Sequence, residues 1–212
     1  MTKNSETARQ IVLNLLDIGA IKLNLEDPFT WASGWKSPIY CDNRLALSYP
    51  QIRDYIKHAL SSVVKDHFAG TEAIAGVATA GIPQGALVAD ELDLPFIYVR
   101  SKPKGHGLTN QIEGNVVANQ KVAVIEDLVS TGGSSLKAVE AIRSAGMEVL
   151  GMVSIFTYGF DISAQNFKQA NVRYLSLSDY DTLISVGIEK DIIPKAQVDR
   201  LKAWRTAPDS WR

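Results

Sequence analysis

The sequence predicts an α/β protein with a mainly parallel, twisted sheet flanked by helices. Short apolar runs of strand type alternate with segments of helical periodicity through the middle of the chain. Runs that are apolar at every position are typical of strands buried on both faces of a parallel sheet. A length of 212 residues suits one α/β domain with an elaboration.

The first part of the chain predicts a helix, a turn-rich stretch and a second helix. Over residues 5–20, apolar side chains recur at helical spacing until a glycine ends the pattern. Residues 28–44 are rich in aromatic residues and turn formers, which indicates short strands and loops. Ser48 offers a capping box with Gln51, and Pro50 suits the first turn of the helix that follows.

Strands and helices then alternate, and residues 162–205 are expected to give one or two further helices besides the last predicted strand. We expect residues 46–177 to form the core of the protein. Residues 1–45 and 178–212 are expected to come together as a small cap, or hood, over one end of the sheet. The predicted strands span residues 73–77, 96–99, 122–126, 149–156 and 173–177, and the predicted helices among them span residues 83–90 and about 135–145.

Composition excludes several classes of function. Lys and Arg number 22 against 23 Asp and Glu, a net charge of −1, so no global basic field favours nucleic acid or an anionic membrane. A single cysteine, Cys41, excludes an intrachain disulfide and agrees with a reducing compartment. The first residues lack the apolar core of a signal peptide, and no run of about 18 apolar residues occurs. We therefore expect a soluble, cytoplasmic protein with no nucleic-acid or membrane partner.

The most informative stretch of the chain runs from Val122 to Ser135. Four apolar residues lead into two adjacent carboxylates, Glu126 and Asp127, and a small-residue loop then opens a helix. A Gly-rich turn at a helix N-terminus binds anions, because unpaired N–H groups and the helix dipole both favour a phosphate. The loop lacks the lysine of a Walker motif and the spacing of a dinucleotide fingerprint. Carboxylates that accept hydrogen bonds from vicinal hydroxyls, beside a cradle for one phosphate, suit a ribose 5-phosphate.

This order of parts closely resembles the phosphoribosyl-pyrophosphate (PRPP) motif of type I phosphoribosyltransferases. The resemblance implies that the acids hold the 2′- and 3′-hydroxyls of the ribose and that the loop holds the 5′-phosphate. The turn after the strand at 73–77 is by itself typical of an ordinary strand–helix connection, but beside this motif it resembles the family's pyrophosphate loop. The resemblance thus places PRPP on Glu126, Asp127, Leu128, Val129, Ser130, Thr131, Gly132, Gly133 and Ser134, and pyrophosphate on Thr79, Ala80 and Gly81.

A basic segment follows the strand predicted at 96–99. Arg100, Lys104 and His106 are among four potential cations within seven residues, interleaved with proline and glycine. Residues 101–110 carry little apolar surface to anchor them, so we expect this loop to be mobile without ligand. Taken alone, the segment is a solvated basic loop. Beside a PRPP site, a cationic loop can close on pyrophosphate and exclude water from a reactive ribosyl centre.

Two segments resemble orotate phosphoribosyltransferases more narrowly. Tyr98–Gly107 resembles the catalytic loop of that family, and Phe29–Tyr40 resembles its F-T-x-x-S-G-x-K-S-P element, which lies over the orotate. The resemblance implies transfer of ribose 5-phosphate from PRPP to orotate in de novo pyrimidine (UMP) synthesis, with Mg²⁺ carried by PRPP. It also implies a homodimer in which basic loop residues reach the partner's active site. The catalytic residues would be Lys104, His106, Glu126 and Asp127, and the loop residues Arg100, Lys104 and His106 would bind PRPP.

Three positions depart from the best-known form of that family. Ser101 stands where a lysine often follows the loop arginine, and Ala32 replaces a lysine of the N-terminal element. Tyr158 stands where an arginine frequently meets the orotate carboxylate. The resemblance gives Ser130 a contact with orotate, and Arg44 is our candidate for the carboxylate. The alternative for Arg44 is a surface ion pair with Asp42 or with an acid of the cap.

Two other functions are compatible with the sequence. The first is another nucleobase phosphoribosyltransferase, against which the N-terminal element and the Lys104/His106 loop argue. The second is a PRPP-sensing regulator, which would need an added DNA-binding domain and a basic surface. No basic recognition helix precedes the core, and the net charge is −1.

Overall fold

The computed structural model describes residues 5–31, 33–101 and 111–211. The strands of its central sheet are β5 (Ala73–Val77), β6 (Phe96–Val99), β7 (Ile112–Glu113), β8 (Lys121–Val129), β9 (Glu148–Thr157) and β10 (Tyr174–Asp179). They lie in the order β10-β9-β8-β5-β6-β7. All neighbours pair in parallel except β7, which is antiparallel to β6. The predicted α/β class with a mainly parallel sheet is confirmed.

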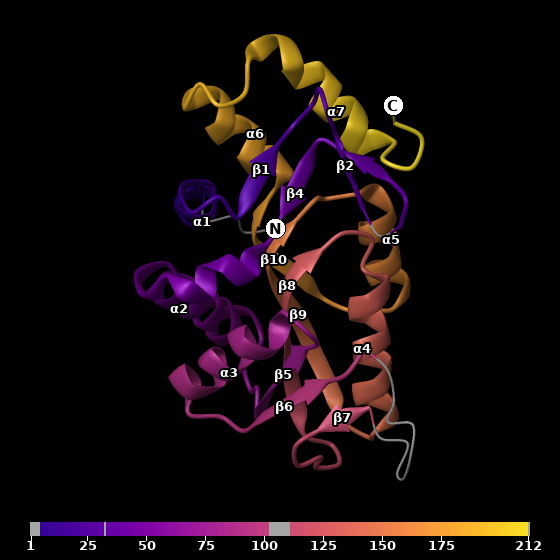
Figure 1. Cartoon of the computed structure of the whole chain (residues 1–212). Helices are drawn as coiled ribbons and strands as arrows, with labels where there is room; N and C mark the ends of the chain where they lie inside the picture. Colours follow the sequence, from indigo (N-terminus) through magenta and orange to yellow (C-terminus); the bar gives the residue numbers. More distant parts are fainter. Residues whose placement is uncertain (1–4, 32, 102–110, 212) are drawn as a thin grey trace.

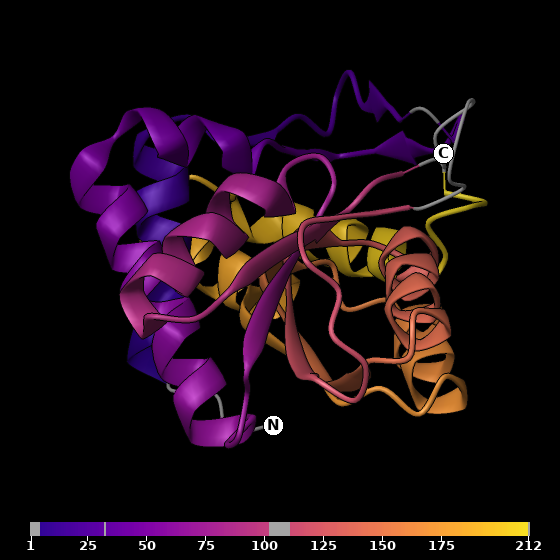
Figure 2. The ribbon, with the colours of Figure 1, turned by 90° about the horizontal axis from the view of Figure 1, so that it is seen from below.

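Helices cover both faces of this sheet (Figure 2). The helices α1 (Ser5–Asp17), α2 (Pro50–His67) and α3 (Gly81–Leu92) lie on one face, and α4 (Gly133–Ser144) and α5 (Asp161–Gln169) lie on the other. Among the described residues, no helix has both the length and the apolar character needed to cross a bilayer.

Each face of the sheet has its own set of buried apolar side chains. Along β8, Val122 and Val124 pack with residues of α4 and α5, whereas Ala123 and Ile125 pack with residues of α1, α2 and α3. Because successive side chains of a strand point to opposite faces, a strand buried on both sides must be apolar at every position. This explains the continuous apolar runs in the sequence.

The N-terminal strands and the C-terminal helices lie together at one end of the molecule (Figure 1). Strand β1 (Ile21–Leu23) pairs with β4 (Ile39–Cys41), and β2 (Phe29–Thr30) pairs with β3 (Lys36–Ser37). After β10 come α6 (Tyr180–Glu189), the 3-10 helix η2 (Lys195–Gln197) and α7 (Val198–Thr206).

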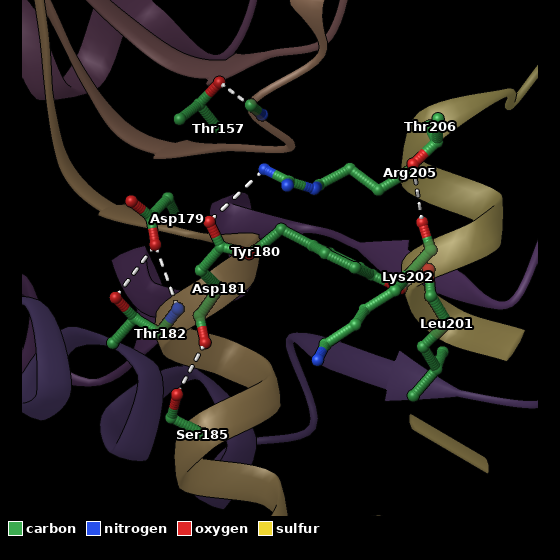
Figure 3. A network of polar contacts seen from close by, with 11 residues as sticks. Thr157, Asp179, Tyr180, Asp181, Thr182, Ser185, Leu201, Lys202, Arg205 and Thr206 are labelled. Atoms are coloured by element: carbon green, nitrogen blue, oxygen red, sulfur yellow. Dashed lines mark hydrogen bonds and ion pairs between the residues drawn. The ribbon is translucent and has the colours of Figure 1, made fainter. Parts of the chain in front are cut away.

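Helices α6 and α7 are joined by polar contacts (Figure 3). The Tyr180 hydroxyl donates to the Leu201 carbonyl at 3.2 Å, and Arg205 Nη1 lies 3.2 Å from Asp181 Oδ2. At the start of α6, the Asp179 carboxylate accepts the backbone N–H of the third residue of the helix, which is an N-cap. These contacts fix the C-terminal helices to the end of β10.

A single tryptophan ties these helices to the N-terminal strands. Trp204 of α7 is fully buried, and its Nε1 donates to the carbonyl of Lys36 in β3 at 3.0 Å. Its ring centroid lies 5.7 Å from that of Trp31 and 5.6 Å from that of Tyr158. On the other side, Arg9 of α1 forms an ion pair with Glu189 of α6. The N-terminal and C-terminal segments therefore share one apolar core.

The start of α2 differs from the predicted capping box. Ser48 is the last residue of a 3-10 helix, η1 (Asn43–Ser48), so the N-cap of α2 is Tyr49, and no side chain caps the helix. Pro50 takes the first-turn position, as predicted. Ser48 does not cap α2 because it is part of the short helix η1, and Tyr49 lies between the two helices.

Other differences concern short elements and element ends. Strand β8 continues through the acid pair to Val129, although the sequence predicted its end at residue 126. The short strands β1 and β7 were not predicted, because two or three residues carry too little periodicity to stand out. Residues 162–205, where one or two helices were expected, hold most of α5 and all of α6 and α7.

Replacing Trp204 by alanine should destabilise the protein by about 3–5 kcal/mol, because it removes a fully buried ring and leaves a cavity. Urea denaturation followed by circular dichroism measures this change. Trp204→Phe keeps most of the ring and loses the hydrogen bond to Lys36, so its loss should be clearly smaller. A loss below about 1 kcal/mol for Trp204→Ala would show that the ring does not hold the two segments together.

Candidate active site

The two acidic residues lie near the carboxyl end of β8 and differ in exposure. Glu126 is 5% exposed, whereas Asp127 is partly exposed. Ser135 Oγ donates to Glu126 Oε2 at 2.9 Å, and the backbone N–H of Asp127 donates to Glu126 Oε1 at 3.0 Å. Asn43 Nδ2 donates to the Asp127 carbonyl at 2.8 Å. Of the two carboxylates, Asp127 is therefore the more available to a ligand.

Burial dominates the electrostatics of this pair. It raises the pKa of Glu126 well above its ordinary value, and the neighbouring charge of Asp127 raises it further. The pKa of Asp127 is also raised by burial, while hydrogen bonds and the charge of Arg44 act in the opposite direction. Two acids held this close in a partly dry site favour ligands that donate hydrogen bonds or bring positive charge.

The loop between β8 and α4 is shaped for an anion. Gly132 has φ +81°, a conformation that L side chains rarely adopt, and a Cβ there would lie 2.7 Å from the ring of Phe167. Asn166 of α5 holds the loop from outside by donating to the Thr131 carbonyl at 2.9 Å. The first N–H groups of α4 have no partner within the helix, so they can bind a phosphate.

A polar pocket of about 270 Å³ brings the acids together with the turn after β5. A Cβ on Gly81, the first residue of α3, would lie 2.6 Å from the Ile125 carbonyl, so only glycine lets this turn approach β8 so closely. The pocket is lined by Cys41, Asp42, Arg44, Ala78, Thr79, Ala80, Glu126, Asp127, Leu128 and Ser134.

A second pocket, of about 310 Å³, lies beside the first and is aromatic. Cys41 and Leu128 line both pockets, so the two share a wall. Burial raises the pKa of the Cys41 thiol well above its ordinary value, which keeps the sulfur uncharged in this wall. The aromatic pocket is lined by Thr30, Trp31, Tyr40, Cys41, Leu128, Ser130 and Tyr158.

The structure divides the predicted phosphate and pyrophosphate residues. Thr79, Ala80 and Ser134 line the polar pocket, and Ser130 lines the aromatic one. Val129 is buried, and its carbonyl accepts a hydrogen bond from Thr157 Oγ1 at 3.1 Å, so this residue fixes the start of the loop through its backbone. Of the described loop residues, Thr131, Gly132 and Gly133 shape the turn and line neither pocket.

The predicted cations are only partly described. Lys104 and His106 lie outside the described residues, as does nearly all of the loop expected to be mobile. Arg100 lies 3.3 Å from Glu113 Oε1, and its backbone N–H donates to the Gln111 carbonyl at 2.8 Å, which joins the two ends of that loop. In the described part of the chain, Arg100 lines neither pocket.

Arg44 lies on the polar pocket and not on the aromatic one. Its Nε lies 2.6 Å from Asp42 Oδ1 and its Nη2 lies 2.9 Å from Asp42 Oδ2, a bidentate pair. This is the ion pair that the sequence offered as the alternative to a contact with a carboxylate ligand.

Several site residues were missed in the sequence. Trp31, Tyr40 and Tyr158 form much of the aromatic pocket; the sequence placed the element of residues 29–40 over the base by resemblance, but it named none of these three side chains as a ligand. Asn43 and Ser135 hold the acid pair through hydrogen bonds and had no signal of their own. Their partners are known only once the fold is known.

Comparisons with known proteins identify relatives of the chain. The phosphoribosyl transferase domain family matches residues 47–182. An orotate phosphoribosyltransferase of Porphyromonas gingivalis is 57% identical over 201 residues, which cover 95% of this chain and 96% of that protein. One from Cytophaga hutchinsonii is 52% identical over 204 residues, covering 96% and 98%. The crystal structure of orotate phosphoribosyltransferase from Aeropyrum pernix matches with a TM-score of 0.75 at 28% identity, covering 87% of this chain and 99% of that one.

The raised pKa of Glu126 predicts a pH-dependent effect of Glu126→Gln. An acid whose pKa is raised by folding stabilises the fold fully below its ordinary pKa of about 4.3, and this contribution is lost as pH rises through the raised value. The variant lacks this loss, so its free energy of unfolding should increase relative to that of wild type as the pH rises above about 4.3.

Urea titrations at several pH values in this range measure the difference. The control is Glu140→Gln, which changes an exposed glutamate of α4 and should give a flat difference. A difference for Glu126→Gln that is equally flat would contradict the burial of a charged carboxylate at this position.

Proposed function

The chain belongs to the orotate phosphoribosyltransferase family, and from this premise we propose that it transfers ribose 5-phosphate from PRPP to orotate. The products are orotidine 5′-monophosphate and pyrophosphate, as in a step of de novo pyrimidine (UMP) synthesis. The observation that carries the proposal is the pair of adjoining pockets. One is polar and contains the acid pair, and the other is aromatic and suits a planar base.

The shared wall gives the proposal its geometry. A ribose in the polar pocket and a base in the aromatic pocket would meet beside Cys41 and Leu128, where the new bond to the anomeric carbon forms. Holding both reactants there in line supplies much of the rate enhancement, and no covalent nucleophile is needed. Ser130 would contact orotate, which is supported by its position in the lining of the aromatic pocket.

Displacement at the anomeric carbon develops positive charge on the ribose and negative charge on the leaving pyrophosphate. Asp127, the more exposed acid, accepts hydrogen bonds from the ribose hydroxyls and stabilises the positive charge. Glu126 accepts the backbone N–H of Asp127 and so positions that residue, besides its own part in holding the ribose.

Phosphate groups are bound on two sides of the ribose. The 5′-phosphate lies on the loop from Ser130 to Ser134, at the N-terminus of α4. Pyrophosphate lies against the turn Thr79–Gly81 and is neutralised by Arg100, Lys104 and His106 when the basic loop closes.

The donor set of the polar pocket fits Mg²⁺ that arrives with its substrate. The oxygen atoms that would hold it beside the substrate are the partly exposed carboxylate of Asp127 and the hydroxyl of Thr79, because both oxygens of Asp42 pair with Arg44. Mg²⁺ is usually bound by one or two carboxylates together with substrate phosphates and retained waters. When bound, it would neutralise charge on the pyrophosphate.

The remaining parts of the proposal concern assembly. We place residues 1–45 and 178–212 in a cap over the core of residues 46–177, with support from the contact of Trp204 with Lys36. The protein acts as a cytoplasmic homodimer that shares its active sites between subunits, and it has no nucleic-acid or membrane partner.

Purified protein with PRPP and Mg²⁺ should consume orotate, followed by its absorbance, and should leave uracil and hypoxanthine unchanged. Asp127→Asn should lower turnover about 10²- to 10³-fold, the range for loss of one group aimed at transition-state charge. Asp93→Asn, at an exposed αL position that asparagine also accepts, serves as the matched control. Turnover of uracil or hypoxanthine instead of orotate would contradict the proposed substrate.

Mixing two inactive variants tests whether active sites are shared. If Lys104 acts on the partner's ribosyl site, a hybrid of Lys104→Ala and Asp127→Asn subunits has one site free of both changes. Random exchange makes about half of the dimers hybrids, so about a quarter of wild-type activity should return. Activity that stays at the level of the separate variants, with exchange verified, would mean that the loop serves its own subunit.

A further inference from the structure

Among the described residues that line the aromatic pocket, none carries a positive charge. The side chains that line it carry hydroxyl, thiol, indole, phenol or aliphatic groups. Burial raises the pKa of Tyr158 well above its ordinary value, so its phenol is neutral at neutral pH. Orotate, the base in the proposed function, carries a carboxylate. A desolvated carboxylate needs charged or hydrogen-bonding partners, so a cation at the edge of this pocket would determine the choice of base.

Lys36 lies at that edge. It occupies β3 directly opposite Thr30 of β2, and its Nζ donates to Thr30 Oγ1 at 2.7 Å. Thr30 in turn lines the aromatic pocket. In the part of the chain that the structure describes, Thr30 is the only partner of the Lys36 ammonium, which has three N–H donors. Two donors and an uncompensated charge therefore remain available beside the pocket.

The backbone under Lys36 is fixed from two sides. Trp204 Nε1 donates to the Lys36 carbonyl at 3.0 Å. The next residue, Ser37, is fully buried, and its Oγ donates to the Ile39 carbonyl at 2.7 Å. The ammonium is thus held by a neutral hydroxyl on a rigid strand, an arrangement that orients a cation without neutralising it.

The competing cation is Arg44, and its situation differs in two respects. It lines the polar pocket, and both of its hydrogen bonds to Asp42 would have to weaken before it could serve another carboxylate. We propose that Lys36, positioned by Thr30, binds the carboxylate of orotate and determines the specificity of the aromatic pocket for an anionic base. This inference rests on the proposed function and assigns the charge recognition within it.

The test compares orotate with orotamide, a neutral analogue of the same shape used as a competitive inhibitor. Lys36→Met should raise the KM for orotate about 10- to 100-fold, the range for loss of a charged hydrogen bond. The inhibition constant of orotamide and the KM for PRPP should change less than about twofold. Lys36→Arg should restore most of the affinity for orotate, because it restores the charge. Thr30→Val should give a smaller rise in the same KM.

Lys202→Met is the matched control, since Lys202 is an exposed lysine of α7 that lines neither described pocket. It should behave as wild type. Thermal denaturation of each variant separates a binding defect from misfolding, and the Arg variant covers the case in which Lys36→Met is unstable.

The outcomes distinguish this inference from the proposed function. A wild-type enzyme that makes no product from orotate and PRPP would overturn both. An active wild type with an unchanged orotate KM in Lys36→Met would overturn only the role of Lys36. The role of Lys36 would also be overturned if Lys36→Met raised the KM for orotate and the inhibition constant of orotamide equally. It would likewise be overturned if Arg44→Met alone abolished the preference for orotate over orotamide.

Discussion

The close approach of α3 to strands β5 and β8 is the constraint on which the polar pocket depends. A Cβ on Gly76 of β5 would lie 2.8 Å from the Gly81 carbonyl, and a Cβ on Gly81 would lie 2.6 Å from the Ile125 carbonyl. Real Cβ atoms do not come this close to backbone oxygen, so any side chain at either position would push the helix away from the sheet. With glycine at both, the turn at Thr79 and Ala80 lies against the acid end of β8.

The close approach buries the carboxylates of Glu126 and Asp127, which costs folding free energy but leaves them available to a ligand. Burial raises the pKa of both carboxyl groups, which means that the folded protein holds charge where water solvates it poorly. Ser135 and the backbone N–H of Asp127 compensate Glu126, and the remaining capacity to accept hydrogen bonds faces the pocket. Sites that bind charged or hydroxylated ligands commonly carry such a cost, which contacts elsewhere in the fold offset. Here the packing of Trp204 against the N-terminal strands is one of those contacts.

How far the sequence could predict this molecule depended on the range of the interactions. Strands β5 and β6 were predicted to the residue, because each is a short apolar run bounded by turn residues. The acid pair and its loop were visible because one strand–loop–helix unit contains them. Ser48 was predicted as an N-cap because its local pattern allows one, and only the structure reveals that Ser48 belongs to the helix η1. The aromatic pocket joins Trp31 to Tyr158, residues far apart in the chain, so a family resemblance could place both near the base but no local pattern could predict their contact.

The two pockets are built from different parts of the chain, and this has a consequence for specificity. The polar pocket takes most of its lining from β8 and the turn after β5, inside the core. The aromatic pocket takes Thr30, Trp31 and Tyr40 from the N-terminal segment of strands and loops, and Asn43, just after that segment, contacts the core through the Asp127 carbonyl. Changes in those strands can alter the base that is accepted without disturbing the carboxylates that hold the ribose. Cys41, in the shared wall, is where the two requirements meet. Its raised pKa keeps the wall neutral, so the negative charge of Asp127 is the one presented to the ribose.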